Sequence, residues 1–112
     1  MEDDGDDNNE NVVQILCEIV SALRIPSVDT DSESDPYVSV YMKGKEVHRT
    51  KHLDDQKNPV WSLETGSLFL LKIHKDKIDL ENEKVSFVIW DWDRMSKDEK
   101  LGEVEIAVQE IL

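Results

Sequence analysis

Carboxylate side chains gather in two short segments of this chain. They are Asp29, Asp31, Glu33 and Asp35 in the first segment, and Asp91, Asp93, Asp98 and Glu99 in the second. Residues two apart in an extended chain point to the same side, so Asp91 and Asp93 project their carboxylates together. Clustered carboxylates repel one another unless a cation lies among them, and such hard oxygen ligands suit Ca²⁺ better than Mg²⁺. Charged runs are also common in solvated loops, so both interpretations stay open at this point.

Two other acidic motifs fit the sequence poorly. An EF-hand loop starting at Asp29 needs glycine at its sixth position and glutamate at its twelfth, where this chain has Ser34 and Val40. The Asp91-x-Asp93 pair also resembles the nucleophile motif of haloacid-dehalogenase-type phosphatases. Met95 stands where that motif has threonine or valine, and the chain lacks the long helical patterns of those enzymes. We therefore expect a domain that is not itself an enzyme.

The distribution of charge is more informative than its total. The 112 residues include 13 basic and 26 acidic side chains, for a net charge of −13, yet residues 1–11 carry six acids and no base. Outside that stretch and the two acidic segments, acids and bases nearly balance. We expect residues 1–11 to be an acidic disordered tail and residues 12–112 to form one domain. The acidic balance argues against nucleic-acid binding, and no apolar run reaches the roughly 18–20 residues of a membrane span.

Most of residues 12–112 shows the two-residue period of half-buried strands. Alternating apolar residues, and turn signals such as Lys43-Gly44-Lys45, predict strands joined by short loops. Residues 67–73 are almost continuously apolar, which fits a strand buried on both faces or a short helix. The expected strands are residues 13–19, 37–42, 46–51, 67–73, 85–90 and 102–108. Without a long helical pattern, they indicate an all-β antiparallel sandwich.

Four short motifs occur in a characteristic order. They are Ser34-Asp35-Pro36-Tyr37-Val38, Asn58-Pro59-Val60-Trp61, Trp90-Asp91-Trp92-Asp93-Arg94 and Leu101-Gly102-Glu103. Their order and spacing over residues 12–112 resemble the C2 domain, the calcium- and phospholipid-binding module of many signalling and membrane-trafficking proteins. The resemblance implies an eight-stranded Greek-key sandwich with Ca²⁺ between loops at one end. The pattern stops after residue 108, where C2 domains have at least one more strand. Either the given sequence is cut short of that strand or the strand is supplied elsewhere, and an unpaired sheet edge would invite association with another chain.

The resemblance also implies a metal-binding set for two or three Ca²⁺ ions. Its members are Asp29, Asp35, Asp91, Asp93 and an acid six residues after Asp93. That last position is Glu99, where the family has aspartate, and Asp98 immediately precedes it. Ser96 is implied as a minor ligand.

Lipid contacts follow from the same resemblance. At the third loop we expect shallow insertion by one apolar residue between two bases that suit anionic head groups, namely Met95, Arg94 and Lys97. A second lipid site, where other C2 domains bind phosphoinositides, is implied at Lys45, Arg49 and Lys51. Ordinary solvated charges on a strand are the alternative interpretation of these three bases.

These inferences predict Ca²⁺-dependent binding to anionic phospholipid, with phosphatidylserine and then phosphoinositide as partners. The domain would act as a targeting module of a larger cytosolic protein, and an enzymatic parent is compatible with this role. The alternative is a Ca²⁺-independent C2-like protein-interaction domain. One cysteine, Cys17, and a start without a basic, apolar leader fit a cytoplasmic location, with recruitment to the membrane when calcium rises.

Overall fold

A computed structural model describes residues 11–23 and 34–112 of the chain. The predicted acidic tail, apart from Asn11, and the first-loop residue Asp29 lie outside the described residues. The described strands are β1 (Val12–Glu18), β2 (Pro36–Met42), β3 (Lys45–Arg49), β4 (Leu68–His74), β5 (Lys84–Asp91) and β6 (Glu99–Ala107). A 3-10 turn, η2 (Leu63–Thr65), precedes β4, and a short helix, α1 (Val108–Ile111), follows β6.

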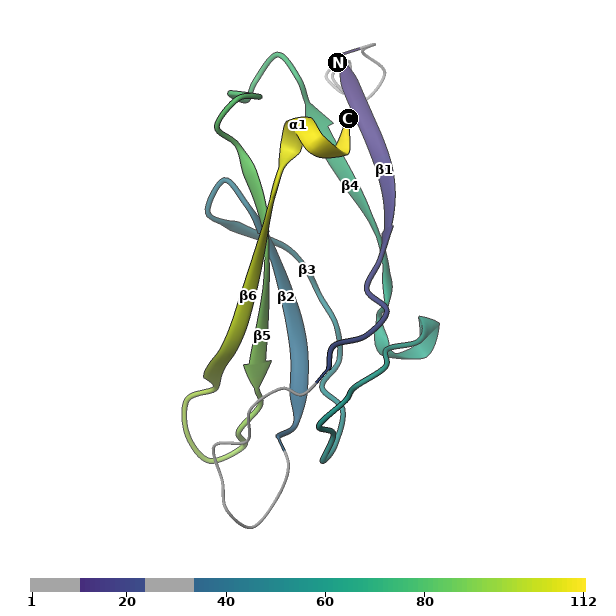
Figure 1. Cartoon of the computed structure of the whole chain (residues 1–112), viewed down its shortest axis with the longest axis vertical. Helices are drawn as coiled ribbons and strands as arrows, with labels where there is room; N and C mark the ends of the chain where they lie inside the picture. Colours follow the sequence, from purple (N-terminus) through teal and green to yellow (C-terminus); the bar gives the residue numbers. More distant parts are fainter. Residues whose placement is uncertain (1–10, 24–33) are drawn as a thin grey trace, which may run out of the picture.

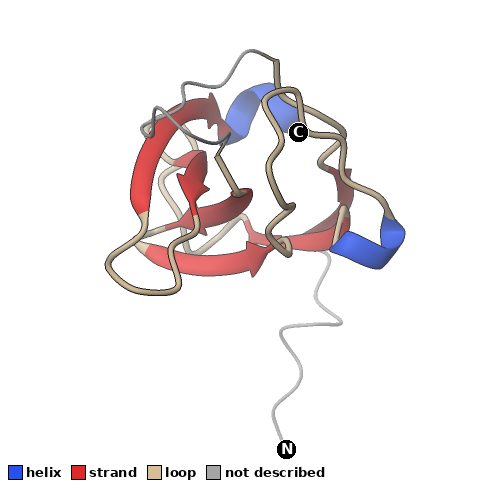
Figure 2. Cartoon of the chain, turned by 90° about the horizontal axis from the view of Figure 1, so that it is seen from below, coloured by secondary structure: helices blue, strands red, loops and turns tan. Residues whose placement is uncertain are grey.

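The strands form two antiparallel sheets that face each other. One sheet has four strands in the order β3-β2-β5-β6, and the other pairs β1 with β4 (Figure 1). Seen along the strands, the sheets curve around a shared interior (Figure 2). The predicted all-β antiparallel sandwich is therefore confirmed.

The alternating residues of the strands supply the core. Val40, Leu71, Ile73 and Val85 are fully buried between the sheets, because alternate side chains of a strand point to the same face. Cys17 packs against this cluster, as a small apolar residue would. Trp61 and seven other buried residues form the cluster, so Trp61 is a packing residue.

Strand β4 differs from both structures expected for residues 67–73. Its burial alternates, with Phe69 and Leu71 buried while Leu68 and Leu70 are exposed. A two-stranded sheet has nothing on its outer face among the described residues, so the outward leucines of β4 remain exposed. The continuous apolar run therefore reflects an exposed apolar face rather than burial on both sides.

Two strand boundaries, the end of β3 and the start of β6, differ from the sequence expectation by more than one residue. Strand β3 ends at Arg49, because the Lys51 N–H turns away to donate to the Thr65 carbonyl at 2.9 Å. Strand β6 begins at Glu99 and ends at Ala107, directly before α1.

The predicted turn is confirmed between β2 and β3, where Lys43 and Gly44 have positive φ values of 55° and 75°. In the described part of the chain, no helix has the length and apolar character needed to cross a membrane.

Candidate metal site at one end of the sandwich

Three neighbouring strands bring acidic residues to the same end of the larger sheet. Asp35 immediately precedes β2, Asp91 ends β5 and Glu99 begins β6 (Figure 1). The register pairs Asp91 with Pro36 on one side and with Glu99 on the other. Directly opposed residues of an antiparallel pair project to the same face, so the Asp91 and Glu99 side chains are neighbours.

Hydrogen bonds connect the first-loop acid to this group. The Asp35 N–H donates to Asp91 Oδ1 at 2.9 Å, and the Asp35 carbonyl accepts from the Trp92 N–H at 2.9 Å. Asp35 Oδ1 in turn accepts from the Asp55 N–H at 2.8 Å. Sequence reasoning did not identify Asp55, because a backbone donor far away in the chain leaves no signal in residue type.

The third loop, residues 92–98, is ordered by its own carboxylates. Asp93 Oδ1 accepts from the Met95 N–H at 2.8 Å, and Asp93 Oδ2 accepts from the Ser96 hydroxyl at 2.7 Å. These hydrogen bonds lower the pKa of Asp93 below its usual value, and the bond from the Met95 backbone has the largest effect. The Asp93 N–H donates to Asp98 Oδ1 at 2.9 Å, which closes the loop.

The second oxygen of Asp98 is directed to a different partner. Asp98 Oδ2 accepts a hydrogen bond from the Tyr37 hydroxyl of β2. Burial of the Tyr37 hydroxyl raises the pKa of Tyr37 well above its usual value, and the hydrogen bond to the Asp98 carboxylate raises it further. Both Asp98 oxygens therefore have donors in the structure, and neither donor is a residue of the Asp35–Asp91–Glu99 group.

The chemistry of the donor set suits a hard cation, since carboxylate and hydroxyl oxygens are preferred Ca²⁺ ligands. Within the described ranges, no three His, Cys, Asp or Glu side chains lie close enough together to hold a metal ion. Asp29, the remaining predicted ligand, is outside those ranges. The structure thus brings Asp35, Asp91 and Glu99 to one end and links Asp93 with Asp98, and the predicted metal site stays a prediction.

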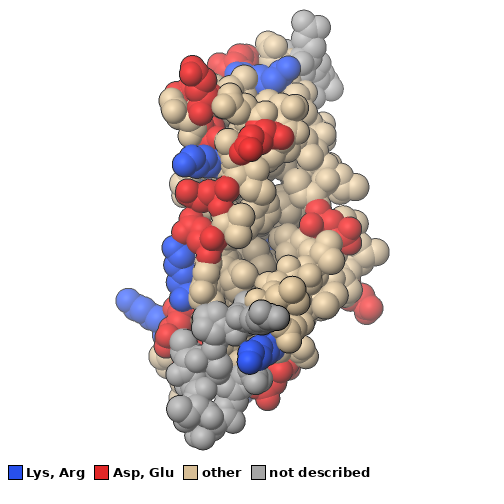
Figure 3. All heavy atoms as spheres, in the orientation of Figure 1, with Lys and Arg blue, Asp and Glu red and all other residues tan. Residues whose placement is uncertain are grey.

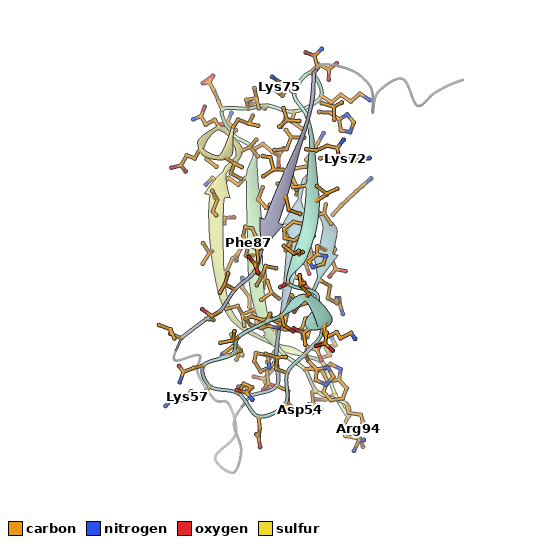
Figure 4. The ribbon with its side chains drawn as sticks, turned by 90° about the vertical axis from the view of Figure 1, so that its right-hand side faces the viewer. Asp54, Lys57, Lys72, Lys75, Phe87 and Arg94 are labelled. Carbon is orange, nitrogen blue, oxygen red and sulfur yellow. The ribbon has the colours of Figure 1, made fainter. Side chains whose placement is uncertain are left out.

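The predicted lipid-contacting residues of the third loop are all exposed. Arg94 and Lys97 flank Met95, whose side chain is 87% exposed. Arg94 lies at the same end of the molecule as Asp54 and Lys57, while Lys72 and Lys75 lie toward the opposite end (Figure 4). The third loop therefore presents its apolar tip and two bases to the solvent.

A basic, aromatic pocket of about 300 Å³ lies beside the third loop. Its lining residues are Tyr37, Arg49, Thr50, Lys51, His52 and Trp92. The Arg49 guanidinium lies 5.1 Å from the centre of the Tyr37 ring, and its charge also pairs with Glu46 at 3.0 Å. His52 stacks on Trp92 with ring centres 4.0 Å apart. Of the three bases expected to act together, the pocket unites Arg49 and Lys51, whereas Lys45 is not among its lining residues.

Sequence reasoning assigned no role in this pocket to Tyr37 or Thr50. Tyr37 belongs to a recognised motif, but its contact with Asp98 spans 61 positions of the chain. Thr50 accepts from the Val38 N–H at 2.9 Å and so holds the chain that follows β3 against β2. Only the folded register reveals that these residues adjoin the bases.

This chain is similar in sequence to known proteins over most of its length. The family model of the C2 domain matches residues 13–112. Synaptotagmin-9 of Rattus norvegicus is 34% identical over 95 residues, which cover 83% of this chain and 18% of that protein. Intersectin-1 of Xenopus laevis is 30% identical over 98 residues, which cover 88% of this chain and 5% of that protein. The chain thus spans less than a fifth of these relatives.

Solved structures show the same architecture. Human GIVD cytosolic phospholipase A2 matches with a TM-score of 0.73 and 25% identity, over 88% of this chain and 12% of that one. A C2 domain of RIM from Drosophila matches with a TM-score of 0.70 and 23% identity, over 89% of this chain and 79% of that one.

Proposed function

Because the chain belongs to the C2 domain family, we propose that it binds anionic phospholipid membranes in response to Ca²⁺. A C2 domain is a non-catalytic module, and similarity to synaptotagmins supports a role in membrane targeting in general. One similar solved structure is a phospholipase A2, and the match covers only 12% of that enzyme's chain. A larger protein that contains this domain and is itself an enzyme is therefore compatible with the proposal. The calcium dependence and the choice of lipid are the specific parts of the proposal.

The observation that carries the proposal is the opposition of two like charges across the β5–β6 pair. Asp91 and Glu99 face each other in register, and Asp35 is hydrogen-bonded to Asp91. Like charges directly opposite in a sheet are destabilising, and a divalent cation between them offsets that cost. Structural packing does not require acids at both positions, whereas a cation site does.

We assign the ligands accordingly as Asp29, Asp35, Asp91, Asp93 and Glu99, with Ser96 as a minor ligand. Glu99 is chosen over Asp98 because it faces Asp91, while the two oxygens of Asp98 accept from Tyr37 and from the Asp93 backbone. Asp98 then serves to hold the third loop against β2. The longer glutamate side chain at position 99 reaches the ion from the start of β6.

Charge explains how ion binding leads to membrane binding. The acidic end is repelled by a cytoplasmic leaflet whose surface potential is about −30 mV. Two or three Ca²⁺ ions add roughly four to six positive charges and reverse that repulsion, and they accept phosphate or carboxylate oxygens of the lipid. Met95 then enters the interface, and Arg94 and Lys97 contact anionic head groups.

A second lipid contact is proposed at the basic pocket. Arg49 and Lys51 supply positive charge, and the Tyr37 and Trp92 rings form the walls of a space large enough for a phosphorylated head group. Lys45 is expected to contribute little, because it does not line this space. The alternative remains that these bases are solvated strand charges, and the Glu46–Arg49 ion pair favours it in part.

Calcium titration by calorimetry, combined with co-sedimentation on phosphatidylserine vesicles, tests the proposal. We expect the parent chain to bind Ca²⁺ and to pellet only with calcium, and the Asp91→Asn, Asp93→Asn double variant to do neither. A matched double variant, Asp76→Asn with Glu110→Gln, changes the net charge equally at exposed positions away from the third loop and should behave like the parent. Absence of both calcium heat and pelleting in the parent would favour the Ca²⁺-independent protein-interaction domain instead.

A further inference from the structure

Met95 is the most exposed large apolar side chain among the described residues. Its side chain is 87% exposed, compared with 75% for Leu23 and 69% for Leu63. Figure 3 shows acidic and basic side chains at the surface of the lower end of the molecule, where the third loop lies in Figure 1. Figure 4 shows Arg94, the residue before Met95, at the outer limit of that end. The thioether of Met95 is therefore open to solvent and to small reagents dissolved in it.

The backbone of Met95 has a different role from its side chain. The Met95 N–H donates to Asp93 Oδ1 at 2.8 Å, and the Ser96 N–H donates to the same oxygen at 3.2 Å. These two hydrogen bonds hold the loop in shape without using the side chain of residue 95. The proposed metal loop thus depends on the backbone of Met95, whereas the proposed lipid contact depends on its side chain.

The other sulfur atoms of the described residues are less accessible. Met42 is half-buried and packs against the core cluster. Cys17 is also half-buried, and burial raises the pKa of its thiol, which lowers the fraction present as the reactive thiolate. Met1 lies outside the described residues. A dilute oxidant should therefore react with Met95 before it reacts with Met42 or Cys17.

We propose that Met95 is a site of reversible oxidation to methionine sulfoxide, and that this modification prevents membrane binding while calcium binding is kept. The membrane part of this proposal rests on the function proposed above. A sulfoxide is polar, so its burial in the lipid interface is disfavoured. The hydrogen bonds from the Met95 and Ser96 N–H groups to Asp93 do not involve the sulfur, so the metal loop should keep its shape.

The chemistry of the modification needs one oxidant and one reductant. Hydrogen peroxide transfers an oxygen atom to the thioether: its O–O bond breaks, an S=O bond forms, the sulfur loses two electrons and water is released. Methionine sulfoxide reductases reverse the change with two thiols, which become a disulfide while the sulfoxide oxygen leaves as water. The modification is therefore a cycle rather than permanent damage.

Peptide mapping by mass spectrometry tests the site of oxidation. In the folded full chain treated with dilute hydrogen peroxide, Met95 should gain one oxygen atom at least about tenfold faster than Met42. In concentrated urea the two rates should become similar, because the protection of Met42 comes from the fold. Equal rates in the folded chain would overturn the proposal, because Met95 would then not be selected by its exposure.

Co-sedimentation with phosphatidylserine vesicles in excess Ca²⁺ tests the consequence, and calorimetry without vesicles measures calcium binding. For the oxidised parent we expect the lipid concentration at half-maximal pelleting to rise at least about tenfold, while the calcium Kd changes less than about threefold. A tenfold change corresponds to about 1.4 kcal/mol, which is less than full burial of a methionine side chain contributes. Treatment with methionine sulfoxide reductases A and B, which reduce the two sulfoxide epimers, should restore pelleting.

Each variant is compared with itself before and after peroxide, because Met95 belongs to the proposed lipid contact. Met95→Leu should pellet equally with and without peroxide, since leucine has no sulfur to oxidise. Met42→Leu is a conservative change in the core that keeps Met95, so it should lose pelleting on treatment as the parent does. Met95→Gln carries a polar amide in place of the sulfoxide and should pellet as weakly as the oxidised parent.

Three results would overturn the proposed switch. Loss of pelleting by peroxide-treated Met95→Leu would show that another residue is the target. Unchanged pelleting of the parent with Met95 fully oxidised would show that the side chain does not contact lipid, and an equal loss of calcium and lipid affinity would show that the loop itself is disrupted. A failure of the function proposed above is distinguishable, because the unoxidised parent would then show no calcium-dependent pelleting, and the switch would fail with it.

Discussion

The opposed pair Asp91 and Glu99 predicts a change of sign in the effect of one substitution. Glu99→Gln removes one of two like charges that face each other across β5 and β6, and preserves the size of the side chain. Without calcium the variant should be more stable than the parent, because repulsion is lost. With calcium it should be less stable, because a ligand has been lost. A residue with a purely structural role would shift stability in the same direction under both conditions.

The magnitudes allow the two effects to be separated. A cross-strand pair contributes about 0.2–1 kcal/mol, and for a domain of this size 1 kcal/mol shifts Tm by about 4–8 °C. The metal-free variant should therefore melt about 1–8 °C above the parent. Calcium at about 100 times the parent Kd stabilises the parent by about 2.7 kcal/mol, and a tenfold weaker Kd reduces that by about 1.3 kcal/mol. This loss exceeds the gain, so the order of Tm values should reverse.

Thermal unfolding followed by circular dichroism, with EDTA and then with excess Ca²⁺, measures both values. Glu81→Gln is the matched control, because it removes one exposed carboxylate from the turn between β4 and β5. It should shift Tm by less than about 1 °C in either condition. A lower metal-free Tm for Glu99→Gln, or the same order of Tm values with and without calcium, would refute the reasoning that the pair is held for a cation.

Three further predictions concern the neighbours of this pair and the core. Tyr37→Phe removes the hydrogen bond to Asp98 and should cost about 1 kcal/mol in urea unfolding, while the calcium Kd changes less than about threefold in calorimetry; a tenfold tighter Kd would show that Asp98 is a ligand. The pKa of Asp93 is lower in the folded chain than in the unfolded chain, so the hydrogen bonds of its carboxylate stabilise the loop fully above the unfolded pKa of about 3.9 and are lost as the pH falls through the folded pKa. The NMR shifts of the Met95 and Ser96 amides should therefore titrate with a midpoint below about pH 3.9. A midpoint above that pH would contradict the assignment. Leu71→Ala should cost about 2–5 kcal/mol in urea unfolding, because Leu71 is 1% exposed, and a cost under about 1 kcal/mol would mean that the core is not as described.

The order and type of the strands could be predicted from the sequence because their signals are local. The two-residue period marks β1, β2 and β6, the β-branched and aromatic residues mark β5, and the Lys43-Gly44 turn marks the hairpin of β2 and β3. Strand β4 shows where such signals fail. A run of apolar residues is the same in sequence whether its second face is buried or exposed, and only the width of the opposite sheet decides between them.

The candidate site was predictable in its residue types but not in its connections. The acidic motifs indicated Asp35, Asp91 and Glu99, and the structure brings them to one end of the sheet. Which of Asp98 and Glu99 faces the group depends on the β5–β6 register, which shifts between Ile89 and Trp90. The role of Tyr37 likewise depends on pairing between distant segments. Asp29 lies outside the described residues, so its part in the site remains a prediction.

The position of Tyr37 has a thermodynamic consequence. Its ring lies under the Arg49 guanidinium and lines the basic pocket, while its hydroxyl bonds to Asp98 in the third loop. One side chain is thus common to both surfaces proposed to meet the membrane. By linkage, any factor by which a phosphate group in the pocket changes the affinity of the loop for calcium must equal the factor by which calcium changes the affinity of the pocket for phosphate. Tyr37→Phe would measure how much of that coupling passes through a single hydroxyl.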